Sequence, residues 1–353
     1  MHTPGGYRVS SFLNEIRQQP EALNTLLQFY TRGEGAALLE TLQPRNDILL
    51  TGMGASFHAA WIASIHLQHL GIAARSIEAT DFLNYSHPSL KPGELAIFIS
   101  QSGNSAEVPP ILEKMGNAGL LAITNKPRSP LAQRARWMFP LLAGSENLIA
   151  SKTYTNSLAL LWLMARRLAG DRFAGVRNEN ELDLLIDLNG QVERIIRHGE
   201  TYAGAFVEGL GAVERLVFIG HGPHAATARQ AAMIMGEWAK HPVLSFSAGG
   251  LRHGFIEALS TGTGAVLFAS PGIAFPSILA LGEELDSYGV RVMYVSNGIV
   301  CRKEEIPVQN RKSDEFLSPI LDILPIQFYA NYLANELEVP PGFLRIQKVI
   351  KKL

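Results

Sequence analysis

Hydroxyl side chains, an amide and a glycine follow an apolar run near residue 100, in an order suited to holding a small anion. The segment Phe98–Val108 reads FISQSGNSAEV. The run Leu95–Ile99 is typical of a buried parallel strand, and Ser105 and Glu107 before apolar residues indicate a helix start, where N–H groups and hydroxyls favour a dianion. The alternative is a polar loop that binds nothing. The predicted phosphate contacts are Ser100, Gln101, Ser102 and Ser105.

A second segment, Arg229–His253, carries groups suited to acid–base chemistry. Apolar residues at helical spacing place Glu237 on a largely buried helix, where desolvation would raise the pKa of its carboxyl toward the range useful for a general base. His253 lies between glycines and hydrophobic residues, in a connection suited to presenting an imidazole. Each residue taken alone is more often structural than catalytic.

A glycine turn, Gly52–Gly54, lies between a predicted strand and a helix over Phe57–Leu70. The third glycine of the dinucleotide-binding motif is absent and no acidic residue fits the ribose position, so we predict no nicotinamide cofactor and no other cofactor. The turn instead allows a small ligand to approach the backbone, with Ser56 as a contact. His58 either faces that ligand or packs inside the protein.

A hydroxyl-rich segment, Ala150–Thr155, precedes a long apolar helix that is predicted to end at Ala169. It is either a helix cap with a solvated lysine or a set of contacts to a sugar-sized ligand. In the second case we expect contacts from Ala150 and Ser151.

The overall composition predicts a soluble globular protein. The chain has 353 residues, 47% of them hydrophobic, and a net charge of −1, which suits two domains or two fused lobes and disfavours a nucleic-acid surface. Its one cysteine, Cys301, excludes intrachain disulfides and cysteine-cluster metal sites, so we predict no metal. We recognise no signal peptide and no membrane-spanning run, and we therefore expect a cytoplasmic protein without a membrane partner.

Alternating strand and helix patterns predict an α/β fold with parallel sheets. Strands are expected at 47–51, 74–78, 95–99 and 120–124, with helices between them. The predicted organisation is N-terminal helices over residues 1–30, a first lobe over 31–175, a connecting helix in 176–200, a second lobe over 201–335 and a tail over 336–353 that closes the site.

The second half of the chain repeats the first. Three predicted strands of the second half match three of the first half. Residues 218–222 match 50–54, residues 265–270 match 95–100, and residues 290–297 match the strand that ends at Asn125. The displacement is nearly constant, at about 170 residues. The copies differ where chemistry is expected, because the hydroxyl loop after Ser100 is replaced by the sequence PGIAF after Ser270. We therefore predict that only the first lobe binds the anion.

Taken together, these motifs resemble the double-SIS (sugar isomerase) family, which includes the isomerase half of glucosamine-6-phosphate synthase, sugar-phosphate deaminases and fructosamine deglycases. Residues 51–59 resemble its glycine–serine turn, residues 100–105 its phosphate loop, and residues 150–152 its Ala-Ser-Thr-Lys segment. The resemblance covers nearly the whole chain. It implies two similar SIS lobes, each a parallel sheet flanked by helices in three layers.

The resemblance also implies roles for individual residues. Glu237 would move a proton between C1 and C2 of a sugar, and His253 would open the sugar ring. The family places a Schiff-base lysine in the C-terminal tail, for which we choose Lys348, with Lys351 and Lys352 as alternatives. Because the family's histidine loop reaches the site of a neighbouring subunit, a homodimer is expected.

The expected function is isomerisation of a 6-phosphorylated amino sugar or sugar amine with release of the amine. The chain departs from the synthase pattern, because no glutaminase domain is recognised and Gly250 stands where the synthase has a glutamate. A deaminase, a deglycase and a plain isomerase therefore all remain open. The alternative from another class is a non-catalytic regulator that binds a sugar phosphate.

Overall fold

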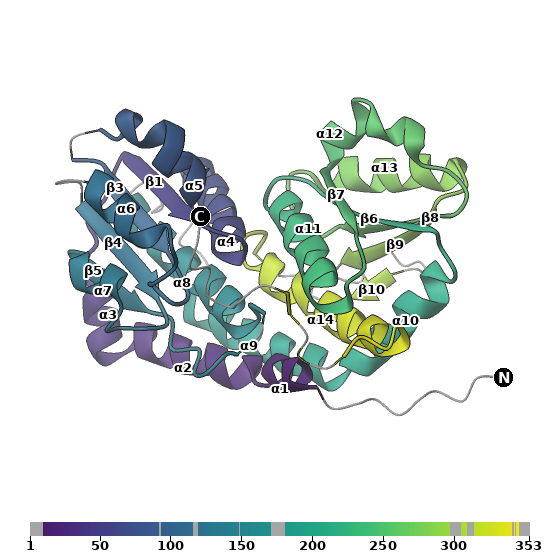
Figure 1. Cartoon of the computed structure of the whole chain (residues 1–353), viewed down its shortest axis with the longest axis horizontal. Coiled ribbons are helices and arrows are strands. Elements are labelled where there is room, and N and C mark those ends of the chain that lie inside the picture. The colour runs from purple at the N-terminus through teal and green to yellow at the C-terminus, as the bar shows by residue number, and fades with distance from the viewer. Residues whose placement is uncertain are drawn as a thin grey trace.

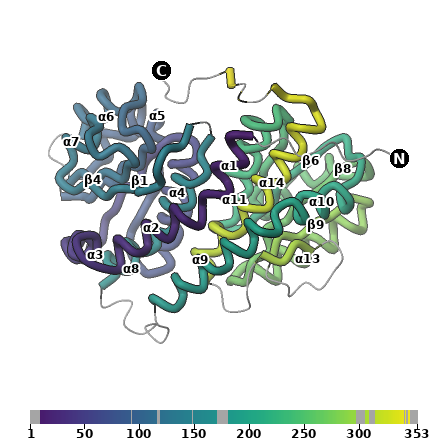
Figure 2. Tube along the Cα trace, turned by 90° about the horizontal axis from the view of Figure 1, so that it is seen from below, coloured from purple at the N-terminus to yellow at the C-terminus, as the bar shows by residue number. Residues whose placement is uncertain are grey.

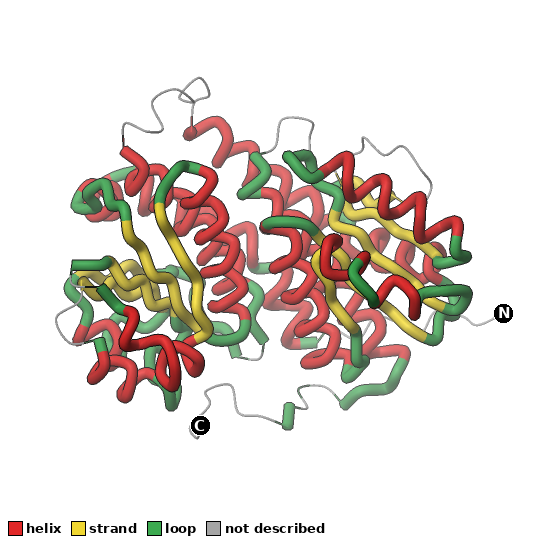
Figure 3. The backbone as a smooth tube through the Cα atoms, turned by 90° about the horizontal axis from the view of Figure 1, so that it is seen from above, coloured by secondary structure: helices red, strands yellow, loops and turns green. Residues whose placement is uncertain are grey.

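A computed structural model of the chain describes residues 10–91, 93–115, 119–147, 149–170, 181–296, 305–308, 314–340, 342, 344 and 345. Figure 1 shows two α/β lobes side by side, each containing its own sheet. Helices lie between the two sheets, as the view in Figure 3 makes clear.

The first lobe is built on a parallel sheet with the strand order β2-β1-β3-β4-β5. Its strands are β1 (Asp47–Gly52), β2 (Ala73–Glu78), β3 (Leu95–Ile99), β4 (Gly119–Thr124) and β5 (Trp137–Pro140). Its α-helices are α3 (Gly33–Glu40), α4 (Ala55–His69), α5 (Ala79–Asp81), α6 (Val108–Lys114), α7 (Pro130–Arg134) and α8 (Lys152–Ala169). A π-helix (Phe82–Ser86) and a 3₁₀ turn (His87–Ser89) follow α5. Thr51 pairs with Phe98, so β1 and β3 end at the same edge of the sheet.

The second lobe repeats this topology, with the strand order β7-β6-β8-β9-β10. Its strands are β6 (Arg215–Gly220), β7 (Leu244–Ser247), β8 (Thr263–Phe268), β9 (Arg291–Ser296) and β10 (Glu305–Pro307). Its helices are α10 (Gly199–Leu210), α11 (Pro223–Ile234), the π-helix η4 (Met235–Ala239), α12 (Ala248–Arg252), the 3₁₀ helix η5 (Phe255–Ala258), α13 (Phe275–Ser287) and α14 (Ser318–Glu336). The strands β6, β8 and β9 occupy the places of β1, β3 and β4, which confirms the repeat predicted from the sequence.

The layers of the two lobes share one hydrophobic core. Outward-facing side chains of the first sheet pack with α6 and α7, and those of the second sheet pack with α12 and α13. The inward faces of both sheets contribute to a single continuous cluster, in which Ile97 of β3 and Phe218 of β6 are joined through the helices between them. The two three-layer lobes predicted from the sequence are therefore present, and they are fused by apolar packing.

Three helices outside the sheets tie the lobes together. The helix α1 (Ser11–Arg17) packs against α14, whereas α2 (Gln19–Thr31) packs against α8. The helix α9 (Glu181–Arg197) contacts both α2 and α14. Sequence spacing had indicated leading helices on the first lobe, but α1 lies against the second lobe because its apolar face meets α14.

Two strands and one helical irregularity were not expected from the sequence. The short strands β7 and β10 lie at the edges of the second sheet, where they pair on one side only. The π-helix η4 interrupts what the apolar spacing predicted as a regular helix through Trp238. None of the helices in the described part of the chain combines the length and apolar character needed to span a bilayer.

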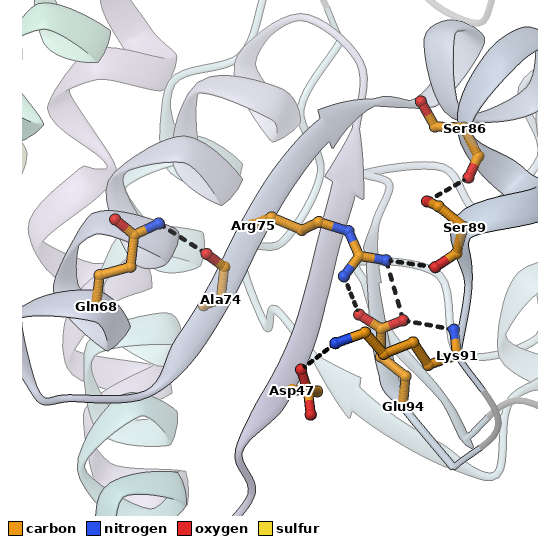
Figure 4. A network of polar contacts seen from close by, with 8 residues as sticks. All are labelled: Asp47, Gln68, Ala74, Arg75, Ser86, Ser89, Lys91 and Glu94. Carbon is orange, nitrogen blue, oxygen red and sulfur yellow. Dashed lines mark hydrogen bonds and ion pairs between the residues drawn. The ribbon is translucent and has the colours of Figure 1, made fainter.

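An ion pair joins Arg75 of β2 to Glu94, the residue before β3, across the intervening strand β1 (Figure 4). Both guanidinium nitrogens of Arg75 donate to the carboxylate of Glu94, at 2.5 and 3.0 Å, and the backbone N–H of Lys91 donates to the same carboxylate at 2.9 Å. The Glu94 side chain is fully buried, whereas that of Arg75 is 33% exposed. Removing the cation therefore leaves a buried charge without its main partner.

We expect Arg75→Ala to lower the free energy of unfolding by about 2–3 kcal/mol, less than for a fully buried pair because Arg75 reaches solvent. The matched control is Lys91→Ala, which removes an exposed ion pair with Asp47 in the same network and should cost below about 1 kcal/mol. Urea unfolding of both variants measures the difference. Equal costs would show that the Arg75 pair contributes no more than a surface contact.

Candidate active site

A cavity of about 300 Å³ opens at the edge of the first sheet where β1 and β3 end. Parallel α/β sheets commonly bind ligands at this edge. The first lobe contributes most of its lining, and the second lobe contributes two residues of one helical segment. The described lining residues are Met53–Ser56, Ile99–Ser102, Ser105, Glu107, Glu146, Ile149, Ala150, Met233, Glu237 and Leu344.

Hydrogen bonds donated by backbone N–H groups hold the loop after β3 in place. The N–H of Asn125 donates to the carbonyl of Gln101, and the N–H of Gly103 donates to the hydroxyl oxygen of Ser100, both at 3.1 Å. Gly103 has φ +57°, and a Cβ there would lie 2.1 Å from the hydroxyl oxygen of Ser129. Only glycine fits this position, so the loop shape exists before any ligand arrives.

The hydroxyl groups of this loop differ in how they are used. Those of Ser100 and Ser102 accept hydrogen bonds from backbone N–H groups, which leaves their own protons available to a ligand. The hydroxyl of Ser105 donates to the carboxylate of Glu107 at 2.5 Å. The helix α6 begins only at Val108 without a side-chain cap, so Ser105 does not cap it as the sequence indicated.

Glu237 reaches the same cavity from the second lobe. It lies in the π-helix η4, a helix irregularity that is frequent at functional sites. Burial raises the pKa of its carboxyl above the usual range, and the Lys240 ammonium opposes this by lowering it. The direction of the pKa shift agrees with the expectation from the sequence.

Glu146 lines the cavity although the sequence reasoning passed over it. Its carboxylate accepts hydrogen bonds from the N–H of Ser151 and of Thr153, at 2.9 and 3.1 Å, and from both of their hydroxyls. Ser151 is fully buried and does not line the cavity, whereas Ala150 does. A carboxylate that precedes two hydroxyl residues at a helix start is the local signal that could have identified Glu146.

The remaining candidates lie elsewhere. His253 is exposed in the turn after α12 and does not line the cavity. His58 is buried, and its Nδ1 donates to Oε1 of Gln230 at 2.8 Å. It therefore joins its own helix, α4, to α11 and does not face the cavity. Lys348 lies outside the described residues. Among the residues that the structure describes, no group of three or more histidine, cysteine or acidic side chains is arranged to hold a metal.

The corresponding place in the second lobe is filled by the protein itself. Ser270, which follows β8 as Ser100 follows β3, donates to the fully buried carboxylate of Asp322, with oxygen separations of 2.8 and 3.0 Å. His224, at the start of α11, lies 3.1 Å from the same carboxylate. An internal anion thus occupies the second lobe where the first lobe has an open cavity.

Comparison with known proteins connects the chain to a family. The SIS domain family matches residues 41–167. The glutamine–fructose-6-phosphate aminotransferase (isomerizing) of Streptococcus pneumoniae strain R6 is 28% identical over 331 residues, which cover 91% of this chain and 54% of that protein. The chain therefore spans about half the length of the curated relatives it matches.

Solved structures share the fold of the whole chain. The C-terminal domain of glucosamine-fructose-6-phosphate aminotransferase from Francisella tularensis has a TM-score of 0.79 at 19% identity, covering 97% of this chain and 99% of that chain. Glucosamine-6-phosphate deaminase from Thermotoga maritima has a TM-score of 0.78 at 21% identity, with the same coverage. Residues 41–167 of this chain are therefore a SIS domain, and the whole chain has the double-lobed fold of these structures.

Proposed function

We propose that the chain is a phosphosugar isomerase that acts on a 6-phosphorylated amino sugar or sugar amine and releases the amine. One observation carries the proposal: the hydroxyl loop of the first lobe and Glu237 of the second lobe line the same cavity. The loop provides neutral donors for a phosphate, and Glu237 provides a carboxylate whose pKa is raised by burial. An anchor at one end and a base at the other suit a linear six-carbon substrate.

The chemistry requires one base that addresses two neighbouring carbons. In an open-chain aldose with an amine at C2, Glu237 takes the C2 proton and delivers it to C1, while a proton passes from the nitrogen to the C1 oxygen. The resulting C2 imine reacts with water to give the ketose and the free amine. In a ketose with an amine at C1, the proton moves from C1 to C2, and water then releases the amine from the C1 imine.

The charge of the cavity supports a substrate that carries an amine. Within the described lining, the charged side chains are the carboxylates of Glu107, Glu146 and Glu237, and none is basic. Carboxylates that surround a ligand favour a cationic ammonium over a neutral hydroxyl. The phosphate is then held by hydroxyls and N–H groups, and the amine lies toward the acidic side of the cavity.

The position of His253 supports a site shared between two copies of the chain. The residue is exposed and lies outside the cavity of its own chain, and in the proposed arrangement another copy brings it to the substrate. A homodimer with two such exchanges satisfies twofold symmetry. In this arrangement His253 opens the sugar ring in the site of the neighbouring copy.

The direct test is turnover of a panel of substrates. We expect release of ammonia from glucosamine 6-phosphate, or of an amine from a fructosamine 6-phosphate, measured with a coupled ammonia assay and by chromatography of the sugar product. Glu237→Gln is the matched inactive control. Tight binding of these compounds without turnover by the wild-type chain would favour the sugar-phosphate regulator instead.

Binding and catalysis should separate between the lobes. Ser102→Ala combined with Ser105→Ala should weaken binding of glucosamine 6-phosphate by about tenfold or more, because the Ser102 hydroxyl donor is lost and Glu107 loses the Ser105 hydroxyl that holds it beside the loop. Glu237→Gln should lower kcat by about 100-fold or more with little change in binding, because the base acts in the transition state. Calorimetry and steady-state kinetics measure the two effects. An equal loss of binding in both variants would contradict this division.

The pH dependence should report the carboxyl of Glu237. A general base must be ionised, so kcat/KM should fall as the pH drops through a pKa that burial holds above the usual carboxyl range. Lys240→Gln removes the cation that lowers this pKa, and the acidic limb of the profile should therefore move to higher pH. Lys91→Ala, a surface change in the first lobe, serves as the control. A limb unmoved by Lys240→Gln would contradict a titrating Glu237 carboxyl that is influenced by the Lys240 ammonium.

A shared site can be tested by mixing two inactive variants. We expect Glu237→Gln and His253→Ala homodimers to lack activity, because each lacks one group in both sites. After unfolding and refolding together, random mixing should restore about a quarter of the wild-type activity, since half of the dimers are mixed and each holds one intact site. The mixture is assayed at fixed total protein. No recovery would refute a site formed by both copies.

A further inference from the structure

The short helix α1 lies between the two lobes, on the side seen in Figure 2. Its N-cap residue Ser10 accepts from the N–H of Leu13 and donates its own hydroxyl proton to Asn331 of α14 at 2.7 Å. A helix of seven residues is not stable alone in water. Its position therefore depends on the partners on either side.

One partner of α1 is the segment that carries Glu237. Phe12 is fully buried, and its ring centroid lies 4.8 Å from that of Trp238. Trp238 directly follows Glu237 in the π-helix η4 and is itself buried. The contact with Phe12 thus fixes the helical turn that presents the carboxylate to the cavity.

The other partner of α1 is the backbone beside Glu146 in the cavity wall. The carboxylate of Glu15, which is buried, accepts from the N–H of Asn147 at 2.6 Å, across 132 positions of sequence. Asn147 follows Glu146, which lines the cavity, and Ala150 lies close by in the same wall. Phe12 and Glu15 are one helical turn apart on α1, so one face of this helix contacts the residues that follow Glu237 and Glu146 on the two sides of the cavity.

The start of α2 strengthens both attachments. Gln18 accepts from the ammonium of Lys152 at 2.6 Å, next to the cavity wall. The fully buried amide of Gln19 donates to Gln327 of α14 at 2.7 Å and accepts from the hydroxyl of Thr155 in α8. The connection between α1 and α2 is thus bonded to both lobes.

We propose that α1 is a positioning element that aligns the sugar-binding wall of the cavity with the catalytic carboxylate. Glu15 acts on substrate binding through Asn147, and Phe12 acts on proton transfer through Trp238. Neither residue touches the substrate. The inference rests on the proposed function and adds two positioning residues to it.

The two residues should affect different kinetic constants. We expect Glu15→Ala to raise KM by about tenfold with kcat within about twofold, because a charge-assisted hydrogen bond that holds the wall is lost. Glu15→Gln retains an oxygen acceptor and should restore most of the wild-type KM. Phe12→Leu should lower kcat by about tenfold with little change in KM. The control is Arg17→Ala on the same helix, which removes an exposed ion pair with Glu200 and should match the wild type.

A binding measurement keeps the inference separate from the proposed function. Calorimetry should show that Glu15→Ala weakens binding of glucosamine 6-phosphate but not of inorganic phosphate, because Glu15 bonds the backbone beside Glu146 and not the hydroxyl loop after β3. Failure of the wild-type chain to turn over any substrate would refute the proposed function, whereas this binding difference would still support the role of α1. Unchanged KM and binding in Glu15→Ala, or a Glu15→Gln variant as defective as Glu15→Ala, would overturn the inference. Should Glu15→Ala fail to fold, Phe12→Leu tests the same inference through kcat, and an unchanged kcat would overturn it.

Discussion

A buried hydrogen bond between the lobes sets the geometry on which the cavity depends. His58 of α4 donates to Gln230 of α11, and burial lowers the pKa of His58 to about 4, so the imidazole is neutral at physiological pH. The helix α4 begins at the glycine turn of the cavity, and α11 continues into the turn that carries Glu237. Because this contact joins α4, which follows the glycine turn, to α11, which leads to Glu237, the two sides of the cavity are held relative to each other by packing inside the protein.

The sequence was most informative where structure is decided locally. Short apolar runs predicted the strands β1, β3, β6 and β8, and the hydroxyl loop was found because its serines lie within six positions of sequence. Features that depend on distant partners were missed. The hydrogen bond from Asn147 to Glu15 spans 132 positions, and the π-turn at Glu237 arises from packing that no local pattern records. Glu146 lies between these cases, since the hydroxyl groups that bond it are only a few residues away.

The two lobes use one topology for different purposes. In the first lobe the chain leaves the position after β3 open and lines it with serines. In the second lobe the position after β8 is closed by Asp322, which Ser270 binds as a ligand would be bound. The duplicated fold therefore supplies one lobe with an open cavity, while the second lobe contributes the π-helix η4 that carries Glu237. This division explains why the hydroxyl loop occurs only once in the sequence.

The internal carboxylate of Asp322 has a consequence for how stability is shared along the chain. In the second lobe the carboxylate of Asp322 belongs to the chain itself, so it is present beside Ser270 whatever the solution contains. Under the proposed function the first lobe would gain the equivalent interactions only from a bound phosphorylated compound, and thermodynamic linkage would then add stability that rises with the logarithm of the ligand concentration. Because the two lobes share one hydrophobic core, this added stability would extend to the whole chain and not to one half alone.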